Sequence, residues 1–324
     1  MFLQRSLRAA LAVMTLAAAG TALPAAAADY PSRPISIIVP YPAGGGADQA
    51  ARTLATMLEK ELGQPVNVVN RGGGAAVPGT MAVSKARPDG YTLGVITSDI
   101  SLYKPQGLAD LSYEDVTPIS QTTQIAAGVN VVANAPYKTM QDLMQAIKDQ
   151  PGQLKATGAA PGVNWHVAFL GLMMDQGLDP ATVIWVPTQG GTAGHLDVAA
   201  GNSTFSTASM AEARALIEAG KIRPLAVMAD TRLEMFPDVP TLKEAVGSEW
   251  TYALWHGLVG PKDLPEDVMA RLAPAIQKVV QSDAFKQSLQ ERGFQVVGRA
   301  GDEFRDFMAA DLKTMTEVLG QIKK

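Results

Sequence analysis

Short apolar segments rich in β-branched residues alternate with stretches of helical periodicity along most of the chain. The pattern predicts strands over residues 35–39, 66–69, 91–97, 125–133, 154–157, 182–187, 204–206, 224–229 and 252–259. Apolar spacing and capping residues predict helices over 48–62, 139–150, 164–176, 193–200 and 210–219. From residue 265 onward the pattern is mostly helical, with Gly293 and Gly301 as interruptions. This alternation favours an α/β fold with mostly parallel sheets that helices cover on both faces.

The first 28 residues follow a different pattern. Arg5 and Arg8 precede an apolar run over 9–19, and the segment ends with three alanines up to Ala28. A basic start, a short apolar core and small residues at the end are the parts of a secretory signal peptide. The run is shorter than the about 20 apolar residues that a membrane span needs. We therefore predict cleavage after Ala28 and a periplasmic location.

Composition and charge exclude several function classes. The 324 residues are enough for about two domains, and they contain no cysteine, which excludes disulfides, thiol catalysis and cysteine-based metal sites. The chain has 27 basic and 31 acidic residues. Without Arg5 and Arg8 of the leader, 25 basic residues stand against 31 acidic ones, a net charge of −6. Such a chain is a poor candidate for binding nucleic acid, which usually needs a basic face.

Three glycine-containing loops, over 40–48, 158–164 and 187–192, lie between a predicted strand and the helix that follows it. Open α/β sheets bind ligands at this position, where glycines let the backbone approach and helix-start N–H groups suit an anion. Tight turns alone would explain any single loop equally well. No phosphate-binding lysine follows the first loop, no G-x-G-x-x-G frame fits, and Asp48 would repel a polyphosphate. A small carboxylate therefore fits better than a nucleotide.

Motifs for catalysis are absent from the sequence. It contains neither G-x-S-x-G nor H-E-x-x-H. His166, His195 and His256 are widely spaced, and we interpret them as packing or hydrogen-bonding residues. Trp165 and His166 directly follow the second loop and are the aromatic pair expected nearest to a bound molecule. We expect no catalytic residue, no metal and no cofactor, and a protein that is not an enzyme.

Five segments of the chain occur in the order that a known family shares. They are IIVPYPAGGGAD at 37–48, VNVVNR at 66–71, PDGYTL at 88–93, VPTQGG at 186–191 and DVPTLKE at 238–244. On these residues the chain resembles the substrate-binding proteins of tripartite tricarboxylate transporters, also called Bug proteins. The resemblance runs through essentially the whole chain after the leader.

The resemblance implies a two-domain periplasmic binding protein of type II-like architecture. Each domain would be a mostly parallel sheet flanked by helices, with the ligand cleft between the domains. The first domain would hold residues 29–128 and 254–324, and the second 129–253. The expected function is capture of a small carboxylate by domain closure, for delivery to the integral membrane subunits of a transporter. We expect a monomer that does not bind nucleic acid.

The same resemblance assigns the ligand-binding residues by motif position. They are Tyr41, Ala43, Gly44, Gly45, Asp48, Gly158, Gly162, Asn164, His166, Thr188 and Gln189. Of these Asp48 has a structural explanation as well, because a helix N-cap at this position would be worth about 1 kcal/mol.

Departures from the family pattern bear on the ligand. The loop 158–164 lacks two hydroxyl residues that many relatives have, and Thr188 and Gln189 replace a tyrosine and a lysine. The segment 204–209 contains no acid where relatives commonly have one. We therefore expect a carboxylate without an ammonium group, and leave aromatic acids, dicarboxylates and tricarboxylates open. A sensory protein that delivers its ligand to a receptor kinase is one alternative, and an exported α/β hydrolase is another.

Overall fold

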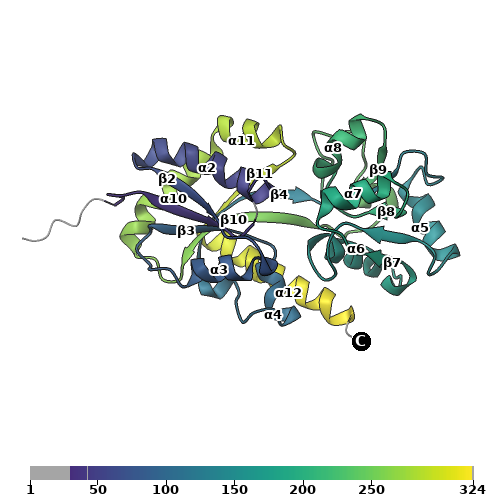
Figure 1. Cartoon of the computed structure of the whole chain (residues 1–324), viewed down its shortest axis with the longest axis horizontal. Helices are drawn as coiled ribbons and strands as arrows, with labels where there is room; N and C mark the ends of the chain where they lie inside the picture. The colour runs from purple at the N-terminus through teal and green to yellow at the C-terminus, as the bar shows by residue number, and fades with distance from the viewer. Residues whose placement is uncertain (1–29, 42, 323–324) are drawn as a thin grey trace, which may run out of the picture. The chain divides into compact units, whose positions relative to one another are not determined.

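Two β-sheets organise the described residues from Arg33 onward (Figure 1). The computed structural model describes residues 30–41 and 43–322, so the predicted signal peptide lies outside the described residues and stays a prediction. Among the described residues, no helix combines the length and the apolar character that a membrane crossing requires.

The first sheet has six strands in the order β11-β4-β10-β3-β1-β2. Their bounds are β1 (Ile35–Val39), β2 (Val66–Asn70), β3 (Thr92–Thr97), β4 (Val116–Ala126), β10 (Ala253–Pro261) and β11 (Gln295–Ala300). Strand β1 pairs in parallel with β2 and β3, whereas β10 runs antiparallel to β3 and β4, and β11 antiparallel to β4.

The second sheet has five strands in the order β7-β6-β8-β5-β9. Their bounds are β5 (Gly128–Val132), β6 (Lys155–Thr157), β7 (Ile184–Val186), β8 (Phe205–Ser206) and β9 (Ile222–Val227). Strand β6 is parallel to β7 and β8, and β5 is antiparallel to β8 and β9. The α/β class is confirmed, but both sheets are mixed where we predicted mostly parallel ones. The strands next to the points where the chain passes from one sheet to the other are antiparallel to their neighbours. The direction of a strand cannot be predicted from its apolar pattern.

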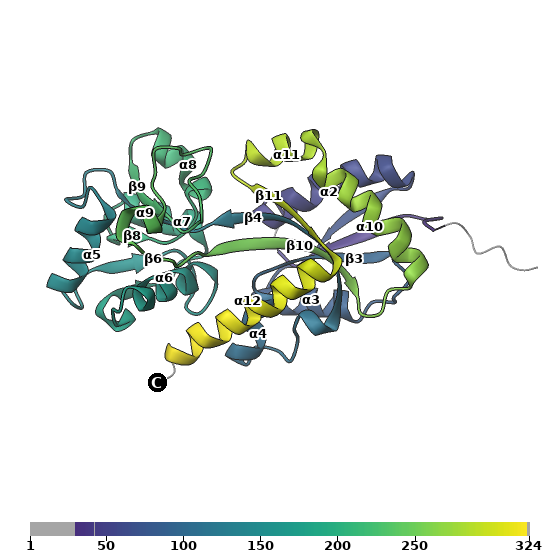
Figure 2. The same cartoon turned by 180° about the vertical axis from the view of Figure 1, so that it is seen from behind.

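Helices flank both sheets. Their bounds are α2 (Gly46–Leu62), α3 (Val77–Ser84), α4 (Ile100–Gln106), α5 (Met140–Asp149), α6 (Asn164–Asp175), α7 (Gly191–Ala199), α8 (Met210–Glu218), α9 (Leu242–Val246), α10 (Glu266–Gln281), α11 (Asp283–Gln290) and α12 (Gly301–Ile322). Helix α12 packs against α4, with Phe304 and Met308 in one core with Ile100 and Tyr103 (Figure 2).

The chain passes from the first sheet to the second at Ala127, between β4 and β5. The N–H of Ala127 donates to the Tyr252 carbonyl at 2.9 Å, and the N–H of Tyr252 donates to the Met228 carbonyl at 3.0 Å. The prediction of one strand over 125–133 was therefore wrong, because two buried strands follow one another without a turn residue between them. The predicted domain boundaries lie near these changes of sheet and stay a prediction.

Helix starts and stops follow local chemistry in most places. The capping box of Thr139 and Asp142 begins α5, and Gly63, with a φ of 70°, ends α2, in agreement with the predicted helix start at 139 and helix end at 62. However, α2 begins at Gly46, so Asp48 lies inside its first turn and is not the N-cap. Strand β11 was missed because two glycines flank a short apolar stretch inside an otherwise helical region.

Candidate functional site

A cavity of about 380 Å³ lies at the carboxyl ends of β1, β2 and β3. Its lining residues are Pro40, Tyr41, Gly73, Ala75, Ala76, Asp99, Leu102, Tyr103, Leu108, Ala160, Val163, Asn164 and Gln189. The residues up to Leu108 follow strands of the first sheet, and the last four follow strands of the second. No lysine, arginine or histidine is among the described lining residues.

Tyr41 and Asp99 form the polar centre of this cavity. The Tyr41 hydroxyl donates to Asp99 Oδ2 at 2.7 Å and also contacts the Thr97 hydroxyl. Burial raises the pKa of Asp99 more than its polar neighbours Tyr41, Thr97 and Asn164 lower it. Burial and the nearby Asp99 carboxylate also raise the pKa of the Tyr41 phenol. Tyr41 therefore stays a neutral hydrogen-bond donor at physiological pH.

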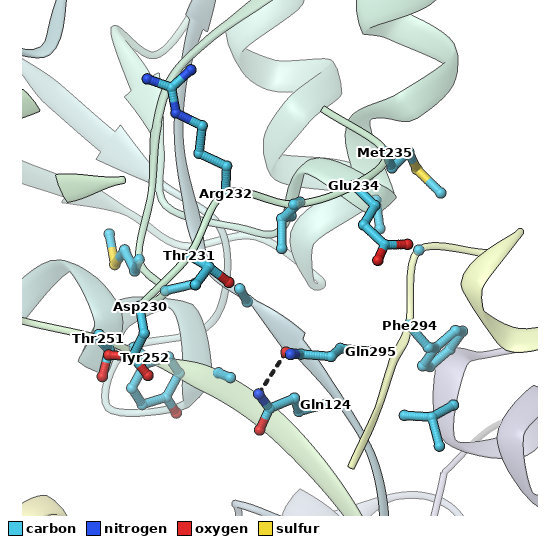
Figure 3. A pocket seen from close by; sticks show the side chains of 18 of the residues that line it. Gln124, Asp230, Thr231, Arg232, Glu234, Met235, Thr251, Tyr252, Phe294 and Gln295 are labelled. Atoms are coloured by element: carbon cyan, nitrogen blue, oxygen red, sulfur yellow. Dashed lines mark hydrogen bonds between the residues drawn. The ribbon is translucent and has the colours of Figure 1, made fainter. Parts of the chain in front are cut away.

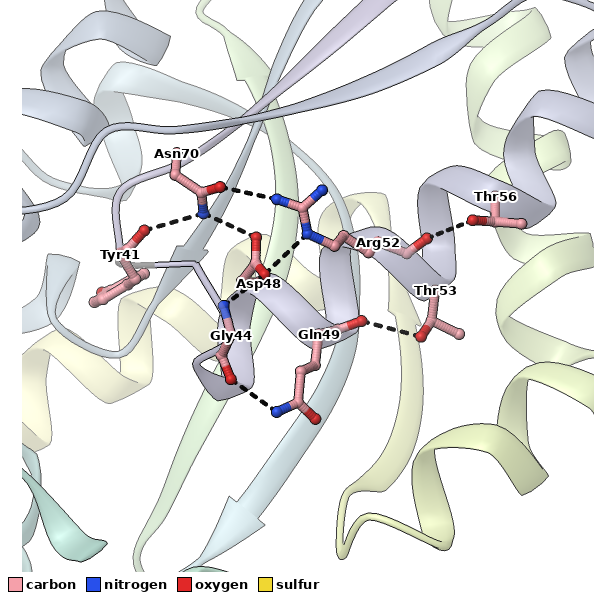
Figure 4. Close-up of polar contacts among 8 residues, drawn as sticks. All are labelled: Tyr41, Gly44, Asp48, Gln49, Arg52, Thr53, Thr56 and Asn70. Carbon is pink, nitrogen blue, oxygen red and sulfur yellow. Dashed lines mark hydrogen bonds and ion pairs between the residues drawn. The ribbon is translucent and has the colours of Figure 1, made fainter.

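Asp48 holds the first glycine loop in place (Figure 4). Its side chain accepts hydrogen bonds from the N–H of Gly44 at 2.8 Å, from Arg52 Nε at 2.9 Å and from Asn70 Nδ2 at 2.8 Å. Asn70 Nδ2 also donates to the Tyr41 carbonyl at 3.1 Å. Burial alone would raise the pKa of Asp48, but these hydrogen bonds outweigh it and the pKa is lowered. Asp48 is thus a support for the loop, and it does not line the cavity.

The second loop is bent around His166. The N–H of Gly162 donates to His166 Nδ1 at 2.8 Å, and the imidazole packs against Trp185 at a centroid distance of 4.4 Å. Burial lowers the pKa of His166 to about 4, so the ring is neutral and accepts this bond. Asn164, the first residue of α6, lines the cavity. Trp165 is buried in the core, where its carbonyl accepts a hydrogen bond from the Thr207 hydroxyl, and it does not line the cavity.

The start of α7, after the third loop, is occupied by a buried side chain of the protein itself, Glu212. The Glu212 carboxyl group lies beside the backbone of Gly191 and Thr192, and burial raises its pKa more than these N–H groups and Ser209 lower it. Helix α7 also approaches the second loop so closely that a Cβ on Gly194 would lie 2.8 Å from Gly158 Cα. Gln189 lines the cavity, whereas Thr188 hydrogen-bonds within the protein. Glu212 therefore lies where an anionic ligand would otherwise meet the N–H groups of Gly191 and Thr192.

Among the predicted site residues, the cavity thus brings together Tyr41, Asn164 and Gln189. Four more support the surrounding loops through internal bonds or close packing: Asp48, Gly158, Gly162 and His166. Ala43, Gly44 and Gly45 are exposed and do not line the cavity. Whether a ligand contacts them stays a prediction.

Sequence reasoning missed several lining residues, notably Asp99, Tyr103 and the turn Gly73–Ala76. In that turn Ala75 and Ala76 have φ angles of 52° and 64°, a region that non-glycine residues rarely adopt. All of these residues follow β2 or β3, which flank β1 on either side. The rule that open sheets bind ligands at the carboxyl ends of neighbouring parallel strands would have found them once the strand order was known.

A larger cavity, about 660 Å³, lies elsewhere (Figure 3). One wall carries a 2.7 Å hydrogen bond between Gln124 and Gln295, and the loop containing Asp230 and Arg232 forms another. None of the predicted site residues lines it. We assign the candidate site to the smaller cavity, because there several strand ends and helix starts converge.

The two mixed sheets with flanking helices and the cavity lined from both define a two-domain periplasmic binding protein. Residues 50–323 match the family described as "Tripartite tricarboxylate transporter family receptor", TctC. The chain belongs to this family, as its sequence motifs suggested.

Individual relatives agree with this assignment. Protein BugT of Bordetella pertussis is 30% identical over 94% of this chain and 94% of its own length. A TctC solute-binding protein from Polaromonas, solved without ligand, is similar with a TM-score of 0.78 and 30% identity, over 90% of this chain and 99% of that one. An R. palustris protein solved with adipate has a TM-score of 0.77 and 24% identity, over 90% and 99% of the two chains, and shows the shared fold alone.

Proposed function

We propose that this chain is a periplasmic solute-binding protein that captures a small carboxylate and delivers it to a tripartite membrane transporter. The observation that carries the proposal is the cavity at the strand ends, because both sheets contribute to its lining. The family supports the transporter as the partner and the periplasm as the location.

Helix starts support an anionic ligand. The N-terminal residues of α6 and the turn that leads into α3 line the cavity, through Val163, Asn164 and Ala76. Each helix N-terminus carries a partial positive charge and N–H groups that can bind a carboxylate. The same fold holds adipate in the R. palustris protein, so a carboxylate of that size is compatible with it.

Binding without catalysis is the second part of the proposal. The described residues do contain a serine–histidine pair, Ser206 and His195, at 2.9 Å, but both side chains are fully buried. His195 Nε2 is bonded to the Ser209 carbonyl, and burial lowers the pKa of His195 to about 4. A base with no access to substrate does not support the hydrolase alternative.

Calorimetry against a panel of acids tests the function. The panel holds aromatic acids, dicarboxylates, tricarboxylates and amino acids, each with its uncharged amide as a control. We expect at least one acid to bind with a Kd in the micromolar range or below, and its amide to bind at least about a hundredfold more weakly because the anion meets the helix starts. Equal binding of acid and amide, or no binding by any acid, would contradict the proposal.

If the two domains close on the ligand, Gln106 should contribute to ligand affinity. Its Nε2 donates to the Gly162 carbonyl, and Ser98 Oγ donates to Asn164 Oδ1 at 3.1 Å, so these bonds join the first-sheet helix α4 and its preceding loop to the start of α6. In Gln106→Ala the closed state loses one such bond, and we expect ligand Kd to rise about three- to tenfold.

The matched control is Gln145→Ala, because Gln145 bonds only to Asp149 within α5. It should leave Kd unchanged. Small-angle scattering should show a ligand-induced decrease in the radius of gyration for the wild type. Equal Kd values for all three proteins would remove Gln106 from the closing contacts.

A further inference from the structure

Helix α12 packs in two different cores along its 22 residues. Near its start, Phe304 and Met308 are buried in the core of the first sheet. Near its end, Met315, Val318 and Leu319 are only 3–6% exposed and belong to the core of the second sheet. Figure 2 shows the helix running from the first sheet past α4 towards α6, and it contacts both of these helices. Helix α12 therefore joins the two sheets in addition to the passages of the main chain between them.

A hydrogen bond fixes the middle of α12 to the first sheet. Asp311 Oδ2 accepts the indole N–H of Trp255, a buried residue of β10, at 3.0 Å. Beyond this bond the buried face of the helix continues to Leu319, which is about two further turns. The buried side chains of these two turns have their partners in the core of the second sheet. Packing of the first sheet therefore does not explain the end of α12.

The end of α12 meets the second sheet beside the candidate site. Leu102 of α4 belongs to the same apolar cluster as the end of α12, and it also lines the smaller cavity. We call Leu102, Met315, Val318 and Leu319 the apolar bridge. Helix α6, which α12 contacts, lines this cavity with its first residue, Asn164. The α12 residues of the bridge are not among the described lining residues, so they act on a ligand only through the positions of α4 and α6.

Domain closure gives the apolar bridge a role in binding. When the cavity opens, the start of α6 moves away from α4, and side chains of the bridge become exposed to water. Exposure of apolar surface is unfavourable in proportion to its area. The bridge therefore favours the arrangement in which the walls of the cavity are together, even before a ligand binds. Because apparent affinity falls with the fraction of molecules in the binding-competent state, the bridge strengthens binding without touching the ligand.

We propose that Met315, Val318 and Leu319 are positioning residues for ligand binding, which keep the walls of the cavity together in the free protein. The inference rests on the proposed function. The hydrogen bond from Gln106 to the Gly162 carbonyl acts on the same side, but water can replace a hydrogen bond when the cavity opens. Water does not replace an apolar contact in this way. The apolar bridge is therefore the larger contribution to the closed arrangement.

The variant Met315→Ala tests the inference. It removes most of one bridge side chain and leaves the lining of the smaller cavity unchanged. By small-angle scattering we expect a larger radius of gyration for the free variant than for the free wild type. By calorimetry we expect Kd to rise at least about fivefold, because fewer molecules are closed without ligand. The probe is whichever of benzoate, adipate, citrate and glutamate binds the wild type most tightly.

Met308→Ala is the matched control. It is the same substitution in the same helix, at a side chain that is also buried, but Met308 packs in the core of the first sheet alone. Both variants should lose stability in urea denaturation. Only Met315→Ala should change the radius of gyration of the free protein and Kd. Val318→Ala is a smaller truncation in the bridge that should change both quantities in the same direction, and it replaces Met315→Ala if that variant does not fold.

A free Met315→Ala protein with the same radius of gyration as Met308→Ala would overturn the inference, and so would an unchanged Kd. Either result would leave carboxylate binding by the wild type intact. If none of the four acids binds the wild type, the wider acid panel judges the proposed function. Scattering by the free proteins then still decides whether the apolar bridge holds the walls of the cavity together.

Discussion

Asp48→Asn is expected to lower the free energy of unfolding by about 2–4 kcal/mol and to weaken ligand binding by at least about tenfold. The Asp48 side chain is almost completely buried and accepts bonds from Gly44, Arg52 and Asn70. An asparagine retains one oxygen and turns an N–H₂ toward groups that are themselves donors, so at least one of these donors loses its partner. Through Asn70 the change also reaches the Tyr41 backbone at the cavity.

Arg52→Gln is the control for the contacts of Arg52, which are the ion pair with Asp48 and a hydrogen bond from Nη2 to Asn70 Oδ1 at 2.9 Å. The Arg52 side chain is 52% exposed, and exposed ion pairs contribute about 0–1 kcal/mol. Urea denaturation should therefore separate the two variants, with the Arg52 variant close to wild type. Equal losses of stability would mean that the contacts of Arg52, and not the bonds that Asp48 accepts from Gly44 and Asn70, hold the loop.

Gly194→Ala is expected to cost about 2–4 kcal/mol of stability and to weaken ligand binding by more than tenfold. In the interior of a helix this substitution normally stabilises, by up to about 1 kcal/mol. Here the added Cβ would lie 2.8 Å from Gly158 Cα and 3.0 Å from Gly158 N. These are backbone atoms of the second loop, so the overlap can be relieved only if α7 or the loop moves.

Gly320→Ala provides the matched control in α12, because a Cβ there meets nothing within 4 Å. It should leave binding unchanged and raise the unfolding midpoint slightly. Thermal unfolding and calorimetry on both variants measure the two effects. A Gly194 variant as stable as the wild type would show that the loop accommodates the extra methyl.

Local patterns predicted much of the secondary structure. The strand 35–39 and the capped helix after Thr139 are as expected, since hydrophobic periodicity and capping act over a few neighbouring residues. The break at Ala127 and the mixed polarity of the sheets were not predictable in this way. Both depend on which strands pair, and residues far apart in the chain decide that.

The sequence by itself determined the family, the α/β class and three of the residues that line the cavity: Tyr41, Asn164 and Gln189. Contiguous motifs carry this information, because each of these three residues lies in a loop that directly follows a strand in the sequence.

Only the tertiary structure decided what the neighbours of these residues do. Glu212 occupies the start of α7, Gly194 packs closely against Gly158, and Asp99 accepts the Tyr41 hydroxyl. The physical reason is that burial and hydrogen-bond partners belong to the three-dimensional surroundings of a group. An aspartate before a helix is an ordinary cap in one environment, whereas Asp99 is a buried acceptor for the Tyr41 hydroxyl in this one.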